Sequence, residues 1–253
     1  MDTLNLENPA ITAAPTAQPS RVRAFWITAL WGLFIAVAMA VGQLAIFVLA
    51  LWQDGPFDIL GGKVIPLSVI ISLPFVLAAS WLAVHFMRGS FTEYLALRGT
   101  SWKNFLIGAV GLAVVVLAWE MISLATGHES SSGSIMTGVF KAARDDGALW
   151  LLVLVLAVCV GAPVSEEVFA RGFLYRGWSE SFLRVPGAIV LSSLAWTALH
   201  GQYYNWFSFG EVFSMGLWFG YVRYRSGSIW ATIVIHGLNN LAAVVQTYYM
   251  ASQ

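Results

Sequence analysis

Long runs of apolar residues dominate the chain and restrict it to folds that a lipid bilayer can accommodate. A helix needs about 20 mostly apolar residues to cross a hydrocarbon core about 30 Å thick. Backbone polar groups in lipid must bond within their own segment, which favours helices over open strands. We therefore predict an all-α fold, a polytopic membrane helix bundle with about seven transmembrane helices. The predicted segments are residues 24–52, 64–87, 104–125, 148–174, 186–204, 207–222 and 227–250.

The composition excludes a water-soluble globular protein. Hydrophobic residues make up 58% of the chain and charged residues 10%, whereas an average soluble domain has about 25% charged residues. The 13 Lys and Arg are balanced by 13 Asp and Glu, so no basic excess supports binding to nucleic acid. We expect the chain to contact membrane lipid and to bind no nucleic acid.

The distribution of basic residues predicts the orientation in the membrane, because cytoplasmic loops are enriched in Lys and Arg. With the N-terminus inside, all but three of the 13 basic residues fall on the cytoplasmic side. The three exceptions are Lys63, Lys141 and Arg144. We therefore expect an integral protein of the plasma (inner) membrane with a cytoplasmic N-terminus and an external C-terminus.

Three regions are expected along the chain. Residues 1–23 contain Pro9, Pro15 and Pro19 and no aromatic residue, which is typical of a disordered tail, here cytoplasmic. Residues 24–147 would hold the N-terminal transmembrane helices. Residues 148–250 would form the catalytic transmembrane core, because most ionisable groups within spanning segments lie there.

Polar side chains inside spanning segments are costly and are therefore usually paired or functional. Three predicted helices of the second half carry them. A helix rises about 1.5 Å per residue, so the polar groups would lie about 12 to 21 Å from the cytoplasmic ends of these helices. Because the depths are similar, we expect the groups to form one shared site. The residues are Glu166, Glu167 and Arg171, then His200, and finally His236 with Asn240.

Two adjacent carboxylates differ in their expected partners. Glu167 and Arg171 are four residues apart and share one helix face, so we expect an internal ion pair. Glu166 points about 100° away from Glu167 and has no such partner in its own segment. Pro163 weakens the helix just ahead of Glu166 and would admit water there. A proline without a functional role, as membrane helices commonly contain, is an equally good interpretation.

A carboxylate, two imidazoles and an amide are sufficient to hydrolyse a peptide bond. Glu166 would accept a proton from water as the general base, and His200 would hold that water. His236 and Asn240 would donate hydrogen bonds to the oxyanion. The substrate would be a peptide or a membrane protein, and this mechanism needs no metal or other cofactor.

A zinc site is the competing interpretation. Glu166, His200 and His236 would form a set of two histidines and one carboxylate that suits catalytic zinc. The zinc signature of two histidines flanking a glutamate on one helix is absent. Asn240 is also a poor zinc ligand, so zinc is the second choice.

The polar elements resemble the motifs of the CPBP intramembrane proteases, which include Rce1-type CAAX prenyl endopeptidases and bacteriocin-processing and immunity proteins. The family pattern is Glu-Glu-x-x-x-Arg, then Phe-x-x-x-His, then His-x-x-x-Asn or Asp. In the second element Trp196 replaces the usual Phe, an exchange that we expect to affect packing rather than chemistry, and His200 is in place. The resemblance covers roughly residues 148–241. The first element is matched by Glu166, Glu167 and Arg171, and the third by His236 and Asn240.

The resemblance implies an intramembrane endopeptidase whose site lies in a cavity open to the cytoplasmic side. Glu166, His200, His236 and Asn240 would be catalytic, and Glu167 with Arg171 would support the site. The substrates would be membrane-associated or lipidated, CAAX-like proteins. A non-catalytic immunity or scaffold protein is the alternative. A transporter is disfavoured, because transporters usually repeat their polar interruptions in both halves.

Overall fold

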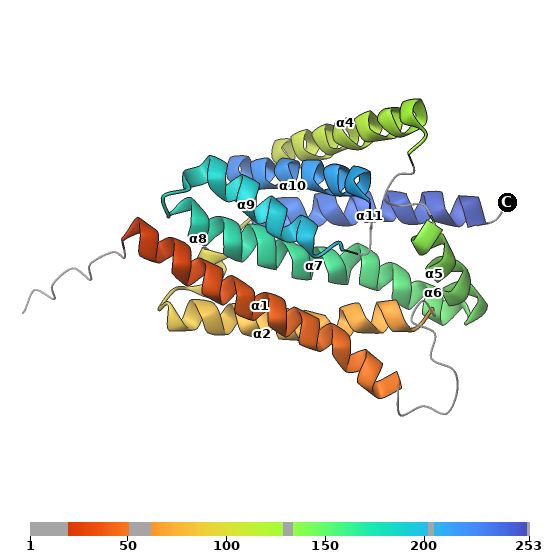
Figure 1. Ribbon diagram of the computed structural model, residues 1–253, viewed down its shortest axis with the longest axis horizontal. Helices are drawn as coiled ribbons and strands as arrows, with labels where there is room; N and C mark the ends of the chain where they lie inside the picture. The colour runs from red at the N-terminus through yellow and green to blue at the C-terminus, as the bar shows by residue number, and fades with distance from the viewer. Residues whose placement is uncertain (1–19, 51–61, 129–133, 202–204, 252–253) are drawn as a thin grey trace, which may run out of the picture.

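The computed structural model describes residues 20–50, 62–128, 134–201 and 205–251. All regular secondary structure in these ranges is helical, and two of the segments, η1 and η2, are π-helices (Figure 1). The segments are α1 Arg21–Ala50, α2 Val64–Phe86, α3 Phe91–Tyr94, α4 Trp102–Thr126, α5 Ser134–Asp145, α6 Ala148–Leu156, η1 Ala157–Gly161, α7 Ala162–Glu167, η2 Val168–Leu174, α8 Tyr175–Ser179, α9 Arg184–Ala198, α10 Trp206–Ser226 and α11 Ile229–Ala251.

Within the described part of the chain, five helical stretches are long and apolar enough to cross a membrane. They are α1, α2, α4, the unbroken helix from α6 to α8, and α11. The predicted fold class, a polytopic membrane helix bundle, is therefore confirmed, but the count of seven spanning helices is not. α9 has 15 residues and so covers about 22 Å, whereas α10 carries three charged side chains, Glu211, Arg223 and Arg225.

Some predicted boundaries differ from the structure. α1 begins at Arg21, so the last three residues of the expected tail are helical. Residues 1–19 of that tail and residues 51–52 of the first predicted segment lie outside the described residues. The fifth predicted segment, 186–204, ends as a helix at Ala198, and its residues 202–204 also lie outside the described residues.

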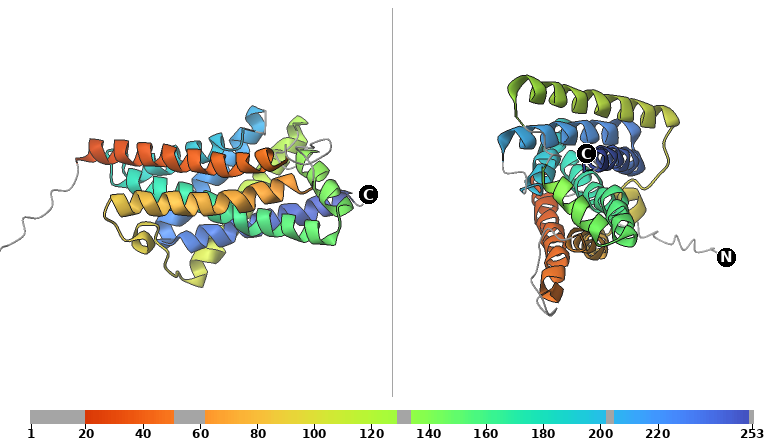
Figure 2. Two further views of the ribbon diagram at one scale, coloured as in Figure 1. Left: turned by 90° about the horizontal axis from the view of Figure 1, so that it is seen from below. Right: turned by 90° about the vertical axis from the view of Figure 1, so that its right-hand side faces the viewer.

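The helix from α6 to α8 runs through the middle of the bundle. α1 and α2 run antiparallel to each other and pack against one side of it, while α9 and α11 pack against another (Figures 1 and 2). α4 lies on the outside against α10 and α11, and α5 contacts α6 and α11 at the end of the bundle opposite the start of α1. Outward-facing apolar side chains such as Leu33, Val114 and Leu152 are more than half exposed, as expected of surfaces that face lipid.

The two π-helical segments lie on either side of α7. In η1 the Ala162 N–H bonds to the Ala157 carbonyl, five residues back. The next donor in this register would be Pro163, which has no N–H. The carbonyl of Val158 therefore receives no bond from that position, and it needs another donor in the apolar interior.

Candidate active site

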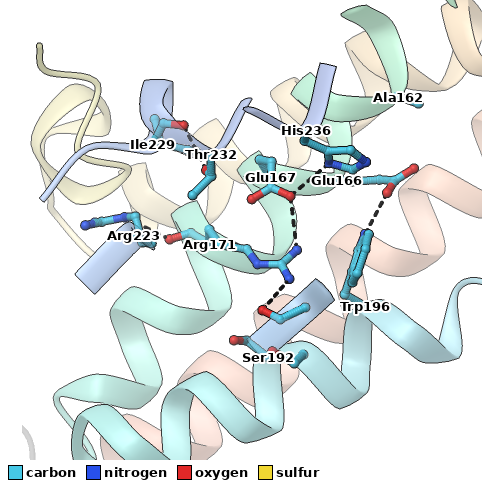
Figure 3. Close-up of polar contacts among 12 residues, drawn as sticks. Ala162, Glu166, Glu167, Arg171, Ser192, Trp196, Arg223, Ile229, Thr232 and His236 are labelled. Atoms are coloured by element: carbon cyan, nitrogen blue, oxygen red, sulfur yellow. Dashed lines mark hydrogen bonds and ion pairs between the residues drawn. The ribbon is translucent and has the colours of Figure 1, made fainter. Parts of the chain in front are cut away.

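Glu167 is the centre of a buried ion network. Its Oε1 lies 3.1 Å from Arg171 Nη1 and 3.0 Å from His236 Nδ1 (Figure 3). The side chains of Glu167 and Arg171 are fully buried. The predicted ion pair between these two residues is thus confirmed, and His236 attaches α11 to it.

Arg171 also binds α10 and α9. Its Nη2 donates to the Gly216 carbonyl at 2.9 Å, and its guanidinium lies 4.5 Å from the centre of the Trp196 ring. A Cβ on residue 216 would come within 3.2 Å of Arg171 Nη2 and 3.1 Å of the Trp196 ring. Glycine at this position therefore lets the α10 backbone approach closely enough to accept the hydrogen bond.

Glu166 faces α9 instead of the ion network. The indole Nε1 of Trp196 donates to Glu166 Oε2 at 2.6 Å, and the Nε2 of His200 lies 3.8 Å from the same oxygen. The sequence interpretation treated Trp196 as a packing residue and missed this contact. The signal was present in the residue type, because an indole N–H is a donor that phenylalanine lacks.

The hydrogen bonds of His200 fix its tautomer. Its Nδ1 lies 3.0 Å from the Trp196 carbonyl oxygen. Because a carbonyl only accepts, this Nδ1 carries the hydrogen. In the neutral form of the ring, this hydrogen bond leaves Nε2, the nitrogen nearer Glu166, without a hydrogen.

Asn240 supplies the donor that the π-helix requires. Its Nδ2 donates to the Val158 carbonyl at 2.9 Å, which is the carbonyl that Pro163 leaves without a bond. One turn earlier, a Cβ on Gly237 would lie 2.6 Å from the Cys159 carbonyl oxygen, so glycine is needed for α11 to pack this closely against η1. His236 and Asn240 share one face of α11, and both contact the helix that carries Glu166.

A cavity of about 290 Å³ brings the predicted catalytic residues together. Glu166, His200, His236 and Asn240 all line it. Apolar side chains from α4, α5 and α10 form much of its wall. Further polar lining comes from Glu120 and Glu211, and none of the described lining residues is Lys or Arg.

The cavity extends from Glu166 toward the end of the bundle at which α5 and the C-terminal half of α11 lie, as its lining residues Phe140 and Thr247 show. α1 begins at the opposite end (Figure 1). A cytoplasmic N-terminus would direct the cavity outward. The cavity lining thus runs toward the side that the basic residues predict to be external, whereas the family resemblance implies an opening on the cytoplasmic side.

The residues do not form an evident metal site. Across residues 20–50, 62–128, 134–201 and 205–251, no three His, Cys, Asp or Glu side chains are grouped closely enough to hold a metal ion. The set of Glu166, His200 and His236 does not meet this spacing as placed, and a site without metal stays a prediction.

These features define a polytopic helical membrane protein with a buried Glu, His and Asn cavity. Residues 148–242 match the family described as Type II CAAX prenyl endopeptidase Rce1-like, and this match supports the resemblance to the CPBP-type family that the motifs indicate. An Escherichia coli protein described as "Uncharacterized 24.3 kDa protein" is 28% identical over 88 residues, which cover 34% of this chain and 40% of that protein. The search of solved structures found no significant match.

Proposed function

We propose that the chain is an intramembrane endopeptidase that hydrolyses peptide bonds of membrane-associated or lipidated, CAAX-like substrates with a water activated by Glu166. The supporting observation is the meeting in one cavity of Glu166 from α7, His200 from the turn after α9 and His236 from α11. The match of residues 148–242 to an endopeptidase family supports the same reaction class.

The attacking water would lie between Glu166 and His200. The 3.8 Å between Glu166 Oε2 and His200 Nε2 is too long for a direct hydrogen bond but lets one water donate to both atoms. Glu166 would take the water proton as the oxygen attacks the scissile carbonyl, and would then pass this proton to the leaving amine.

His236 and Asn240 would stabilise the oxyanion. The Nδ1 of His236 is directed at Glu167, so its Nε2 can donate to an oxyanion only when both ring nitrogens carry hydrogen. An amide nitrogen has two hydrogens, so Asn240 can donate to Val158 and to an oxyanion together. Each donor of this kind contributes about 10²- to 10³-fold to the rate in known enzymes.

The test is cleavage of membrane-anchored peptides, with and without a prenylated cysteine, by purified protein in lipid. Glu166→Gln should keep the fold and abolish hydrolysis, because an amide does not accept the water proton. Glu93→Gln, at an exposed carboxylate of α3, is the matched control and should keep the wild-type rate. Equal product formation by wild type and Glu166→Gln would overturn the proposal.

A further inference from the structure

Trp196 contacts both residues that would hold the attacking water. Its indole N–H donates to Glu166 Oε2, and its backbone carbonyl accepts from His200 Nδ1. One residue thus bonds to Glu166 through its side chain and to His200 through its backbone. Trp196 is 2% exposed, so water has little access to compete for its indole N–H.

The surroundings of Trp196 hold its indole in place. The guanidinium of Arg171 lies over the ring at 4.5 Å, and the rings of His200 and His236 meet it edge-on at 4.8 and 5.6 Å between centroids. Figure 3 shows the indole directed from α9 toward the Glu166 carboxylate. Because three neighbours hold the indole in place, the indole can in turn fix the rotamer of the Glu166 side chain. Contacts around a site commonly orient the reacting groups in this way.

We propose that Trp196 is a positioning residue of the reaction, which orients the Glu166 carboxylate through its indole N–H and sets the His200 tautomer through its carbonyl. This inference rests on the proposed function and adds a residue to it. Phenylalanine at this position keeps an aromatic ring and the backbone carbonyl but removes the indole donor. Trp196→Phe therefore isolates the contribution of one hydrogen bond.

The kinetic test compares Trp196→Phe with Trp218→Phe. Trp218 also donates its indole N–H, at 2.8 Å to the Gly108 carbonyl, but does not line the cavity, so it is a matched control. Loss of a hydrogen bond to a charged group should lower kcat of Trp196→Phe about ten- to hundredfold. Its KM should change little, because phenylalanine keeps an aromatic ring in the cavity wall and the substitution removes the bond to Glu166. Trp218→Phe should keep the wild-type kcat.

A spectroscopic test does not depend on activity. In protein labelled with ¹⁵N at the indoles of its 12 tryptophans, the resonance that Trp196→Phe removes should shift in Glu166→Gln, while that of Trp218 stays in place. An unmoved Trp196 resonance, or a wild-type kcat in Trp196→Phe while Glu166→Gln is inactive, would overturn the positioning role. A shifted resonance in a protein without any hydrolytic activity would instead refute the proposed function and leave the Trp196 contact intact.

Discussion

The carboxylates of Glu166 and Glu167, although adjacent in the chain, bind different helices. Glu166 accepts from Trp196 on α9, whereas Glu167 is bound by Arg171 and by His236 on α11. Only Glu167 is fully buried in an ion network, and only Glu166 lines the cavity. The same substitution at the two positions should therefore have opposite consequences for stability and chemistry.

Glu167→Gln should lower the thermal melting temperature in detergent, because Arg171 then remains as a buried charge without its carboxylate. Glu166→Gln should melt like wild type, since an amide oxygen can still accept from Trp196. Melting curves of the two variants, measured under identical conditions, provide the comparison. Equal melting temperatures would mean that the ion network does not support the fold.

Arg171→Ala should be more damaging than Arg176→Ala. Both arginines pair with a glutamate four residues away, but the Arg171 pair is fully buried and the Arg176 pair with Glu180 is about half exposed. Breaking a buried pair costs about 3–5 kcal/mol, and an exposed pair contributes about 0–1 kcal/mol. The yield of folded protein and its melting temperature measure both effects, and similar losses in the two variants would contradict the explanation.

Asn240→Ala should lower both stability and kcat. The substitution leaves the Val158 carbonyl without its donor, which costs about 1–3 kcal/mol in an apolar interior, and it removes one proposed oxyanion donor. Asn239→Ala is the control, because it removes a neighbouring amide that lines the same cavity. A lower melting temperature with wild-type kcat per folded molecule would limit Asn240 to its contact with the π-helix.

Activity should survive removal of metal ions. In the described residues no three potential ligands are grouped as a metal would require, and the proposed base is a carboxylate. Chelator-washed protein assayed for activity and for bound metal gives the answer. One equivalent of zinc, whose removal and return switch hydrolysis off and on, would replace the proposed mechanism and make Glu166, His200 and His236 ligands.

The orientation can be mapped with reporter fusions. We expect reporters at Arg98 and Arg184 to be cytoplasmic, and those at Arg144 and the C-terminus to be external. α9 runs away from the end of the bundle that we expect to be cytoplasmic, and α10 returns to it. The expected reporter pattern is therefore the same whether these two helices cross the membrane fully, giving seven crossings, or do not, giving five. Asn205→Cys, in a chain whose Cys159 is replaced, separates the two counts, because a thiol reagent added outside reaches it if α9 crosses the membrane fully. The opposite reporter pattern would place the end toward which the cavity extends on the cytoplasmic side.

Much of the fold and the residues of the candidate site were predictable from sequence for physical reasons. Apolar runs that a bilayer requires mark α1, α2, α4 and α11, and four-residue spacing places Glu167 beside Arg171. The end of α9 was not predictable, because the aromatic residues after His200 continue the apolar run although the helix stops at Ala198. Hydropathy indicates whether a segment prefers lipid or water. It does not indicate whether the segment is helical.

The contacts between helices were less accessible to sequence analysis. The bond from Trp196 to Glu166 joins residues 30 positions apart, and that from Asn240 to Val158 joins residues 82 apart. Neither follows from periodicity, because each depends on the rotation of one helix against another. Pro163 marked the weakened helix, but the sequence did not indicate which carbonyl would need a partner or which residue would supply it.

The π-helical segment η1 makes the number of residues ahead of the site as important as their identity. A π-turn uses one more residue than an α-turn, so η1 behaves as an insertion within an otherwise regular helix. Deletion of Cys159 would let this stretch become an ordinary α-helix, and α7 would keep its register relative to α6 because the π-turn absorbs the extra residue locally. Deletion of Val164 in α7, where no π-turn lies, would instead rotate Glu166 and Glu167 by about 100° relative to α6, away from their partners on α9 and α11, while every residue of the three motifs remained unchanged.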